Sequence, residues 1–160
     1  MSSDMVRWID GLYGGLIAGV TSALFYTVVA AAWLHDTTVA GFFAGIAQGL
    51  PTVQRAPQSL ALAALGALGY AVVAAGFGVL YALLARRLPS MWQAPSSVLW
   101  GLFYGLLVWW AINDVLAPVS GAVVDLPLWE GLVGTVIFYG VVLSELTTLA
   151  HRRETTGLAP

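Results

Sequence analysis

Cysteine and lysine do not occur in this chain, and charged residues make up only 9% of its 160 positions. Without cysteine there are no disulfides, thiolate metal sites or cysteine nucleophiles. The net charge of −2 is too small to indicate a charged partner, and no basic patch with interleaved aromatic residues indicates nucleic-acid binding. Phosphate-binding glycine motifs and a nucleophile elbow are also missing. A non-enzymatic protein is therefore the favoured interpretation.

Hydrophobic residues, in contrast, account for 59% of the chain. A soluble domain carries about 25% charged residues, so this composition indicates a membrane protein. A helix needs about 20 apolar residues to cross the hydrocarbon core, and four segments reach that length. We predict an all-α fold in one domain, an integral membrane bundle of four transmembrane helices, with spans at residues 8–34, 59–85, 98–116 and 129–150.

A shorter apolar segment follows the first span. Residues 39–50 cannot cross a bilayer, and Pro51 ends them. This length is typical of a re-entrant or interfacial helix, so we predict one such helix after the first span. A loop with an ordinary amphipathic turn is the alternative interpretation.

Small residues recur at every fourth position in several of these segments, most regularly between residues 11 and 27. Residues four apart share a helix face, and small faces let helices meet in backbone contact within lipid. We therefore predict helix packing through Gly11, Gly15, Gly19, Ala23, Gly41, Gly45, Gly49, Ala74, Gly78, Gly101 and Gly105. If residues 39–50 do not cover the first of these faces, that face is free for a partner.

The arginines are unevenly distributed over the predicted loops. With four spans, both termini and the 86–97 connection lie on the same side of the membrane. The other side holds only Arg55, whereas this side holds Arg7, Arg86, Arg87, Arg152 and Arg153. The positive-inside rule then predicts that both termini are cytoplasmic.

Three polar residues lie within or at the ends of the predicted spans. Ionisable residues at membrane depth are costly and indicate function unless they are paired. Glu145 either lines a proton or substrate path or pairs with an arginine near the cytoplasmic interface, and pairing is favoured. Asn113 and Asp114 end the third span on the opposite side, where they could form an outer polar pocket with His35, Asp36 and Glu130.

His35 and Asp36 are weak candidates for metal ligands at that outer side. Imidazole and carboxylate groups are common metal donors, but the chain has no HxxxH, ExxH or HExxH spacing. By this topology His35 and His151 lie on opposite sides of the membrane, so they cannot form a bis-histidine haem site. We predict no metal and no cofactor.

Residues 40–121 contain, in order, a glycine-rich apolar segment, a small-residue span, and three short motifs. These motifs are Arg86-Arg87-Leu88-Pro89, Gly101-Leu102-Phe103-Tyr104-Gly105 and Val115-Leu116-Ala117-Pro118-Val119-Ser120. The order resembles the YagU-like family of small four-span bacterial inner-membrane proteins, most of them uncharacterised. The resemblance implies a bacterial inner-membrane location and no established chemistry. A histidine is frequent in the second span of that family, whereas this chain has Gly69-Tyr70, which argues against a histidine-based role.

Three functions remain open at this stage. The leading hypothesis is an accessory or scaffolding subunit of a larger membrane complex, whose partners besides the lipid bilayer are other membrane subunits or copies of itself. The alternative is a small oligomeric transporter or channel that uses Glu145 and Asp114. A membrane enzyme or a pigment- or haem-binding protein is the third.

Overall fold

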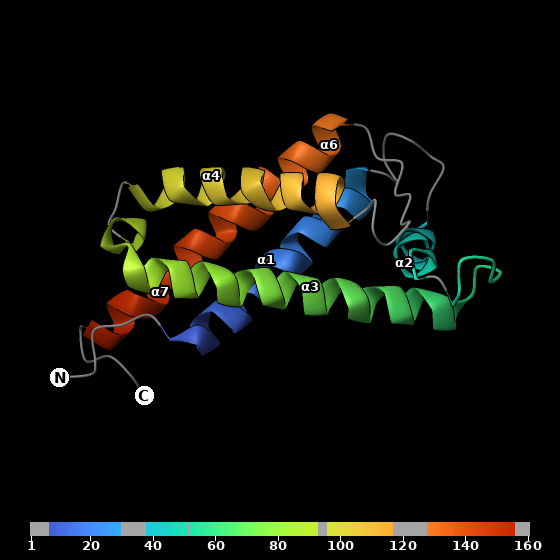
Figure 1. Ribbon diagram of the computed structural model, residues 1–160, viewed down its shortest axis with the longest axis horizontal. Helices are drawn as coiled ribbons and strands as arrows, with labels where there is room; N and C mark the ends of the chain where they lie inside the picture. The colour runs from blue at the N-terminus through green and yellow to red at the C-terminus, as the bar shows by residue number, and fades with distance from the viewer. Residues whose placement is uncertain (1–6, 30–37, 51, 93–95, 117–127, 156–160) are drawn as a thin grey trace.

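The computed structural model describes residues 7–29, 38–50, 52–92, 96–116 and 128–155, and none of them forms a strand. Four long helical segments run along the molecule (Figure 1). Their parts are α1 (Trp8–Val29), α3 (Leu60–Arg87), α4 (Ser96–Trp110) continued by η3 (Ala111–Leu116), and the run of α6 (Leu128–Leu132), η4 (Val133–Val141) and α7 (Val142–Thr155).

Each of the four segments is long and apolar enough to cross a membrane. The prediction of an all-α membrane bundle with four spans is therefore confirmed. Two of the segments contain wider π-helical turns, since η3 and η4 are both π-helices. A short 3₁₀ turn, η2 (Pro89–Trp92), connects α3 to α4.

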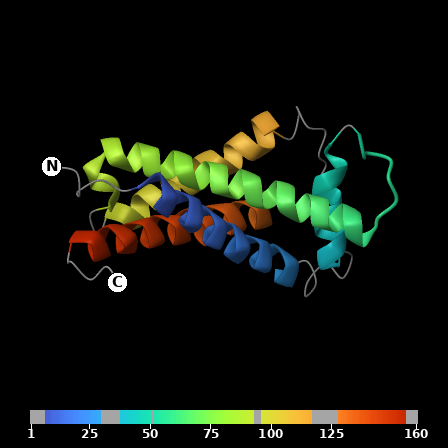
Figure 2. The same cartoon turned by 90° about the horizontal axis from the view of Figure 1, so that it is seen from below.

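The short helix α2 (Val39–Gln48) lies crosswise to the long helices at one end of the bundle (Figure 2). The Thr38 hydroxyl begins it by accepting a hydrogen bond from the Gly41 amide, which is the usual role of an N-cap threonine. Its inner face packs on the first turns of α3, where the carbonyl of Phe43 touches the backbone of Gly66. An orientation across the spans favours the interfacial alternative over the re-entrant one.

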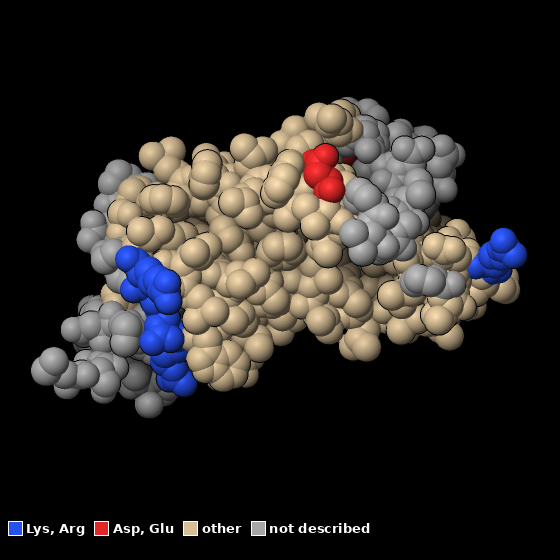
Figure 3. Space-filling model, in the orientation of Figure 1, with Lys and Arg blue, Asp and Glu red and all other residues tan. Residues whose placement is uncertain are grey.

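The distribution of residue types between surface and interior suits a bundle in lipid. Large aliphatic and aromatic side chains such as Leu68, Leu99 and Phe103 are exposed, whereas the interior is built mainly from small residues, tyrosines and hydroxyl residues. On the face shown in Figure 3, basic side chains lie towards the two ends, and one acidic patch lies between them near the upper edge. Because lipid removes the hydrophobic force between helices, close packing and hydrogen bonds hold such a bundle together.

The backbones of α1 and α3 come into direct contact. A Cβ atom added at Gly15 would lie 2.5 Å from the Ala74 carbonyl oxygen and 2.8 Å from the Gly78 Cα, and one added at Gly78 would collide with the Gly11 carbonyl oxygen. The small-residue face of α1 is therefore covered by α3 and not by α2. At Gly11, Gly15 and Gly19 this face is therefore not free to bind a partner protein.

A second backbone contact joins α4 to η4 and α7. A Cβ atom at Gly101 would lie 2.7 Å from the Gly140 carbonyl oxygen, and one at Gly105 would lie 2.7 Å from the Val136 Cα. Gly45 on α2, in contrast, has open space where a Cβ would stand. The predicted packing residues therefore fall into two groups. Glycines such as Gly78 and Gly101 contact the backbone of a neighbouring helix, whereas Gly45 does not.

The α1–α3 contact makes a direct prediction about stability. Gly78→Ala places a methyl group against the α1 backbone, and we expect it to lower the free energy of unfolding by roughly 1–3 kcal/mol. Gly76→Ala on the same helix is the matched control, because a Cβ there meets nothing within 4 Å. That substitution should stabilise the helix by roughly 0.5–1 kcal/mol. Thermal unfolding of both variants in mild detergent measures the difference, and equal effects would contradict the contact.

Candidate functional site

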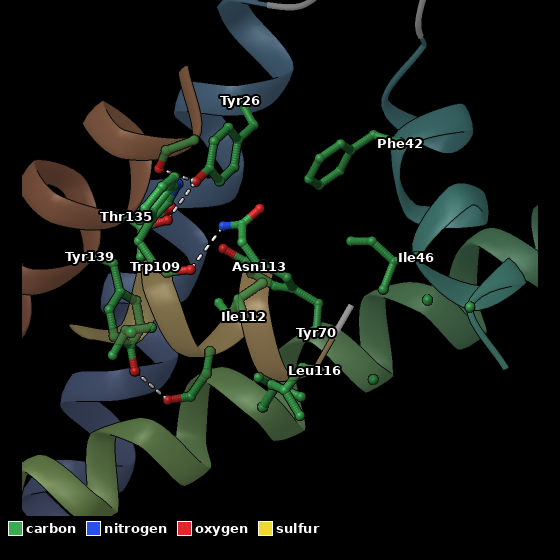
Figure 4. A pocket seen from close by; sticks show the side chains of 18 of the residues that line it. Tyr26, Phe42, Ile46, Tyr70, Trp109, Ile112, Asn113, Leu116, Thr135 and Tyr139 are labelled. Atoms are coloured by element: carbon green, nitrogen blue, oxygen red, sulfur yellow. Dashed lines mark hydrogen bonds between the residues drawn. The ribbon is translucent and has the colours of Figure 1, made fainter. Parts of the chain in front are cut away.

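A cavity of about 490 Å³ lies in the half of the bundle that contains α2. Every long segment contributes to it, as does α2 (Figure 4). The α1 and α3 helices touch between Gly11 and Gly19 and then separate (Figure 2), and α2 lies across the opening that results. The cavity therefore lies beyond the point at which the backbone contact between α1 and α3 ends.

Aromatic side chains form much of the cavity wall. Tyr26 on α1 and Phe42 on α2 stack with their ring centroids 5.8 Å apart, and Tyr70 on α3 and Trp109 on α4 also line the space. Aliphatic residues such as Ile46 and Ile112 complete the lining (Figure 4). Most of the surface offered to a ligand is therefore apolar.

The widened turns of the last span accept hydrogen bonds from α1. The Tyr26 hydroxyl lies 3.1 Å from the Gly131 carbonyl oxygen and 2.8 Å from the Thr135 hydroxyl. The Ser22 hydroxyl donates to the Gly134 carbonyl oxygen at 2.9 Å. These bonds connect α1 to α6 and η4 beside the cavity, and they supply partners to backbone carbonyls at the point where the helix becomes a π-helix.

Two further tyrosines connect α3 to its neighbours around the cavity. The Tyr70 hydroxyl donates to the Gly19 carbonyl oxygen on α1 at 3.1 Å, and the Tyr139 hydroxyl of η4 donates to the Ala74 carbonyl oxygen at 2.6 Å. Both acceptors belong to regular helices and share their lone pairs with the helical bonds. The tyrosines are thus structural ties whose oxygens also face the cavity.

Asn113 is the predicted polar residue that does line the cavity. Its side-chain amide donates to the Trp109 carbonyl oxygen one turn earlier, at 2.8 Å, and it faces the space between Tyr26 and Ile46 (Figure 4). Asn113 and Asp114 are both exposed, but Asp114 does not line the cavity. The structure therefore separates these two neighbours.

Glu130 is the carboxyl group with the least access to solvent in the described part of the chain. Its side chain is only 1% exposed, and neither of its oxygens has a hydrogen-bond partner. It lies at the start of the last span, next to Gly131, which accepts the Tyr26 bond. A carboxyl group without a partner is costly away from water, so we expect this position to destabilise the fold.

Glu145, the most conspicuous polar residue of the sequence, lies far from the cavity on α7. It is half-buried, and its Oε1 accepts a hydrogen bond from the buried Ser97 hydroxyl at 3.0 Å. This bond joins α7 to the first turn of α4 in the arginine-bearing half of the molecule. Neither Glu145 nor Asp114 contributes to the cavity.

The weak metal candidates His35 and Asp36 lie outside the described residues. Within the described ranges, no three histidine, aspartate or glutamate residues are close enough together to hold a metal ion. The lining of the cavity, as far as the structure describes it, carries hydroxyl and amide groups but no carboxylate, imidazole or arginine. The described polar groups of the lining are therefore hydroxyls and an amide, which can form hydrogen bonds with a ligand.

Sequence analysis did not identify the interhelical tyrosines. Each of Tyr26, Tyr70, Tyr104 and Tyr139 immediately precedes a small residue, which is a signal that could have drawn attention to them. That signal is incomplete, because Tyr13 precedes Gly14 and is nevertheless 60% exposed. Only the arrangement of the helices distinguishes the two cases.

The tie between η4 and α3 can be tested by removing one oxygen atom. Tyr139→Phe keeps the ring and deletes the bond to Ala74, so we expect the free energy of unfolding to fall by roughly 0.5–2 kcal/mol. Tyr13→Phe is the control, since that exposed ring should tolerate the change. Thermal unfolding in the same detergent compares them, and a Tyr139→Phe variant as stable as the parent would show that the bond contributes nothing.

The two glutamates of the last span should respond in opposite directions to the same substitution. Glu130→Leu removes a buried polar group that has no partner, and we expect stability to rise by roughly 1–3 kcal/mol. Glu145→Leu leaves the buried Ser97 hydroxyl without its acceptor, so stability should fall by roughly 1 kcal/mol. Unfolding curves of the two variants provide the measurement. A loss of stability in Glu130→Leu would indicate that this carboxyl group has a favourable partner.

Comparison with protein-family models, curated proteins and solved structures finds no match for this chain.

Proposed function

We propose that this multi-pass membrane protein binds an apolar small molecule in the cavity beside α2. The observation that carries the proposal is a space of about 490 Å³ with an aromatic and aliphatic wall and a few converging polar groups. Ligand sites typically measure about 300–1,000 Å³ and have this mixture of lining. Helix bundles commonly build such sites between facing helices.

The position of the opening supports entry from the lipid. Leu65 and Val73 on α3 and Leu116 on η3 line the cavity, and each is about two-fifths exposed at the outer surface. These side chains mark the mouth of the cavity, and all three are apolar. A molecule dissolved in the bilayer would therefore reach the site without crossing a charged surface.

The packing of the small residues weighs against an accessory subunit that binds its partners through these faces. Such a subunit would need small-residue faces that its own helices leave uncovered. Gly11, Gly15 and Gly78 contact one another, and Gly101 and Gly105 contact the last span. A transporter that uses Glu145 and Asp114 receives no support either, because those side chains lie in different halves of the bundle and line no common space.

The arginine distribution supports a topology with cytoplasmic termini. Described arginines at one end are Arg7, at the start of α1, Arg86 and Arg87, at the end of α3, and Arg152, near the end of α7. Arg55 lies in the connection between α2 and α3, and Figure 3 shows basic side chains at both ends of the molecule. By the positive-inside rule, the end with the cavity would then face away from the cytoplasm.

A glycine that lines the cavity offers a test of this function. Gly69 lines the cavity and has open space around its missing Cβ, so Gly69→Trp should fill the cavity without disturbing backbone contacts. Gly76→Trp is the matched control, since Gly76 is equally open but lies outside the cavity. The probe is adamantyl diazirine, a headless apolar photolabel, applied to the full chain in phosphatidylcholine nanodiscs.

Peptide mapping by mass spectrometry gives the result. Val108, Trp109 and Ile112 should be labelled saturably in the parent and in Gly76→Trp, and this labelling should disappear in Gly69→Trp. Lipid-facing Leu99 and Phe103, on the same helix, should be labelled in proportion to probe concentration in all three proteins. Labelling of the cavity residues that never saturates, or that survives in Gly69→Trp, would contradict a binding site.

A further inference from the structure

We infer that the ligand of this cavity is a neutral apolar molecule bearing a hydroxyl group, such as a lipid alcohol. This inference rests on the proposed binding function and deepens it by naming the chemical class. It follows from two properties of the described lining. The lining residues carry no charge, and their polar groups still have atoms that can form hydrogen bonds with a ligand.

The charge of the lining disfavours an anionic head group. No arginine or histidine occurs among the described lining residues. The arginine nearest along the chain to α2, Arg55, is exposed and is not part of the lining. A carboxylate or phosphate transferred into this space would lose its hydration and gain no counter-charge, which is costly. Fatty acids and phosphorylated lipids are therefore poor ligands on physical grounds.

The hydroxyl groups of the lining have already used their hydrogens. Ser22 donates to the Gly134 carbonyl, Tyr70 to the Gly19 carbonyl and Tyr139 to the Ala74 carbonyl. Tyr26 and Thr135 share a hydrogen bond of 2.8 Å beside the Gly131 carbonyl. A hydroxyl has one hydrogen but two lone pairs, so these groups present mainly acceptors to a ligand.

Asn113 adds a further acceptor close to the same groups. Its amide nitrogen donates one hydrogen to the Trp109 carbonyl oxygen, which leaves the amide oxygen and a second N–H hydrogen for a ligand. Figure 4 shows Asn113 on the same side of the cavity as Tyr26 and Thr135, while Ile46 lies on the other side. A ligand hydroxyl placed between Asn113 and Thr135 would supply the hydrogen that these oxygens are missing, and its apolar part would lie towards α2.

This arrangement predicts an order of preference among ligands of one length. Dodecanol can donate a hydrogen bond, dodecyl methyl ether cannot, and dodecanoate adds a negative charge. We expect dodecanol to bind roughly tenfold more tightly than the ether, which corresponds to about one buried hydrogen bond. Dodecanoate should bind more weakly still. Each is tested as a competitor of adamantyl diazirine labelling at Trp109 and Ile112, with its concentration expressed as mole fraction in the nanodisc.

Two variants identify the groups responsible. Thr135→Val keeps the shape of the side chain and removes an acceptor, and Asn113→Leu is a second variant in case the first fails to fold. Either should reduce the preference for dodecanol over the ether severalfold and leave competition by the ether unchanged. Thr21→Val is the matched control, because the Thr21 hydroxyl bonds its own helix at the Ile17 carbonyl and lies outside the cavity. If Thr135 had only a structural role, Thr135→Val would reduce competition by dodecanol and by the ether to the same extent.

The outcomes separate this inference from the broader function. Equal competition by dodecanol and the ether would overturn the hydroxyl assignment and leave an apolar site in place. Strongest competition by dodecanoate would also overturn it, in favour of an anionic ligand. If adamantyl diazirine labelling of Trp109 and Ile112 does not saturate at all, the proposed binding function is wrong, and so is the inferred ligand class.

Discussion

The structure depends on the backbone contact between α1 and α3. At Gly11, Gly15 and Gly78 each helix lies where the other would place a side chain. In lipid there is no hydrophobic force to drive helices together, so contact of this kind carries much of the packing energy. It also sets the crossing point of the two helices. The space beyond that point, on the side of α2, is where the cavity forms.

Hydrogen bonds from tyrosines hold the helices together in addition to the glycine contacts. Tyr26, Tyr70, Tyr104 and Tyr139 each direct a hydroxyl to a backbone carbonyl on another helix. A tyrosine suits this role because it combines a large apolar ring with a polar tip that needs a partner when buried. The cavity consequently has firm walls: three of these four tyrosines both line it and hold two helices together. Rigid walls reduce the entropy that a ligand must overcome on binding.

The two glutamates of the last span illustrate how depth along a helix differs from burial. From its position in the chain, Glu145 lies well inside the span and Glu130 lies at its outer end. In the folded bundle Glu130 is the more buried of the two side chains and has no hydrogen-bond partner, whereas Glu145 accepts a hydrogen bond from Ser97. Burial depends on what packs over a residue, and that is supplied by segments distant in the sequence. No periodicity within the last span contains this information.

The sequence by itself determined the membrane class, the four spans and the small-residue faces, since each depends on local composition and on a repeat of about four residues. It also pointed to Asn113, although as part of an outer pocket with Asp114 and not as a lining group of this cavity. Only the tertiary structure decided that α3 covers the Gly11–Gly19 face, that α2 lies across the bundle end, and that aromatic rings from five helical elements line a common space. Those outcomes depend on the crossing of helices far apart in the chain, where close contacts at Gly66, Gly78 and Gly101 determine which faces meet.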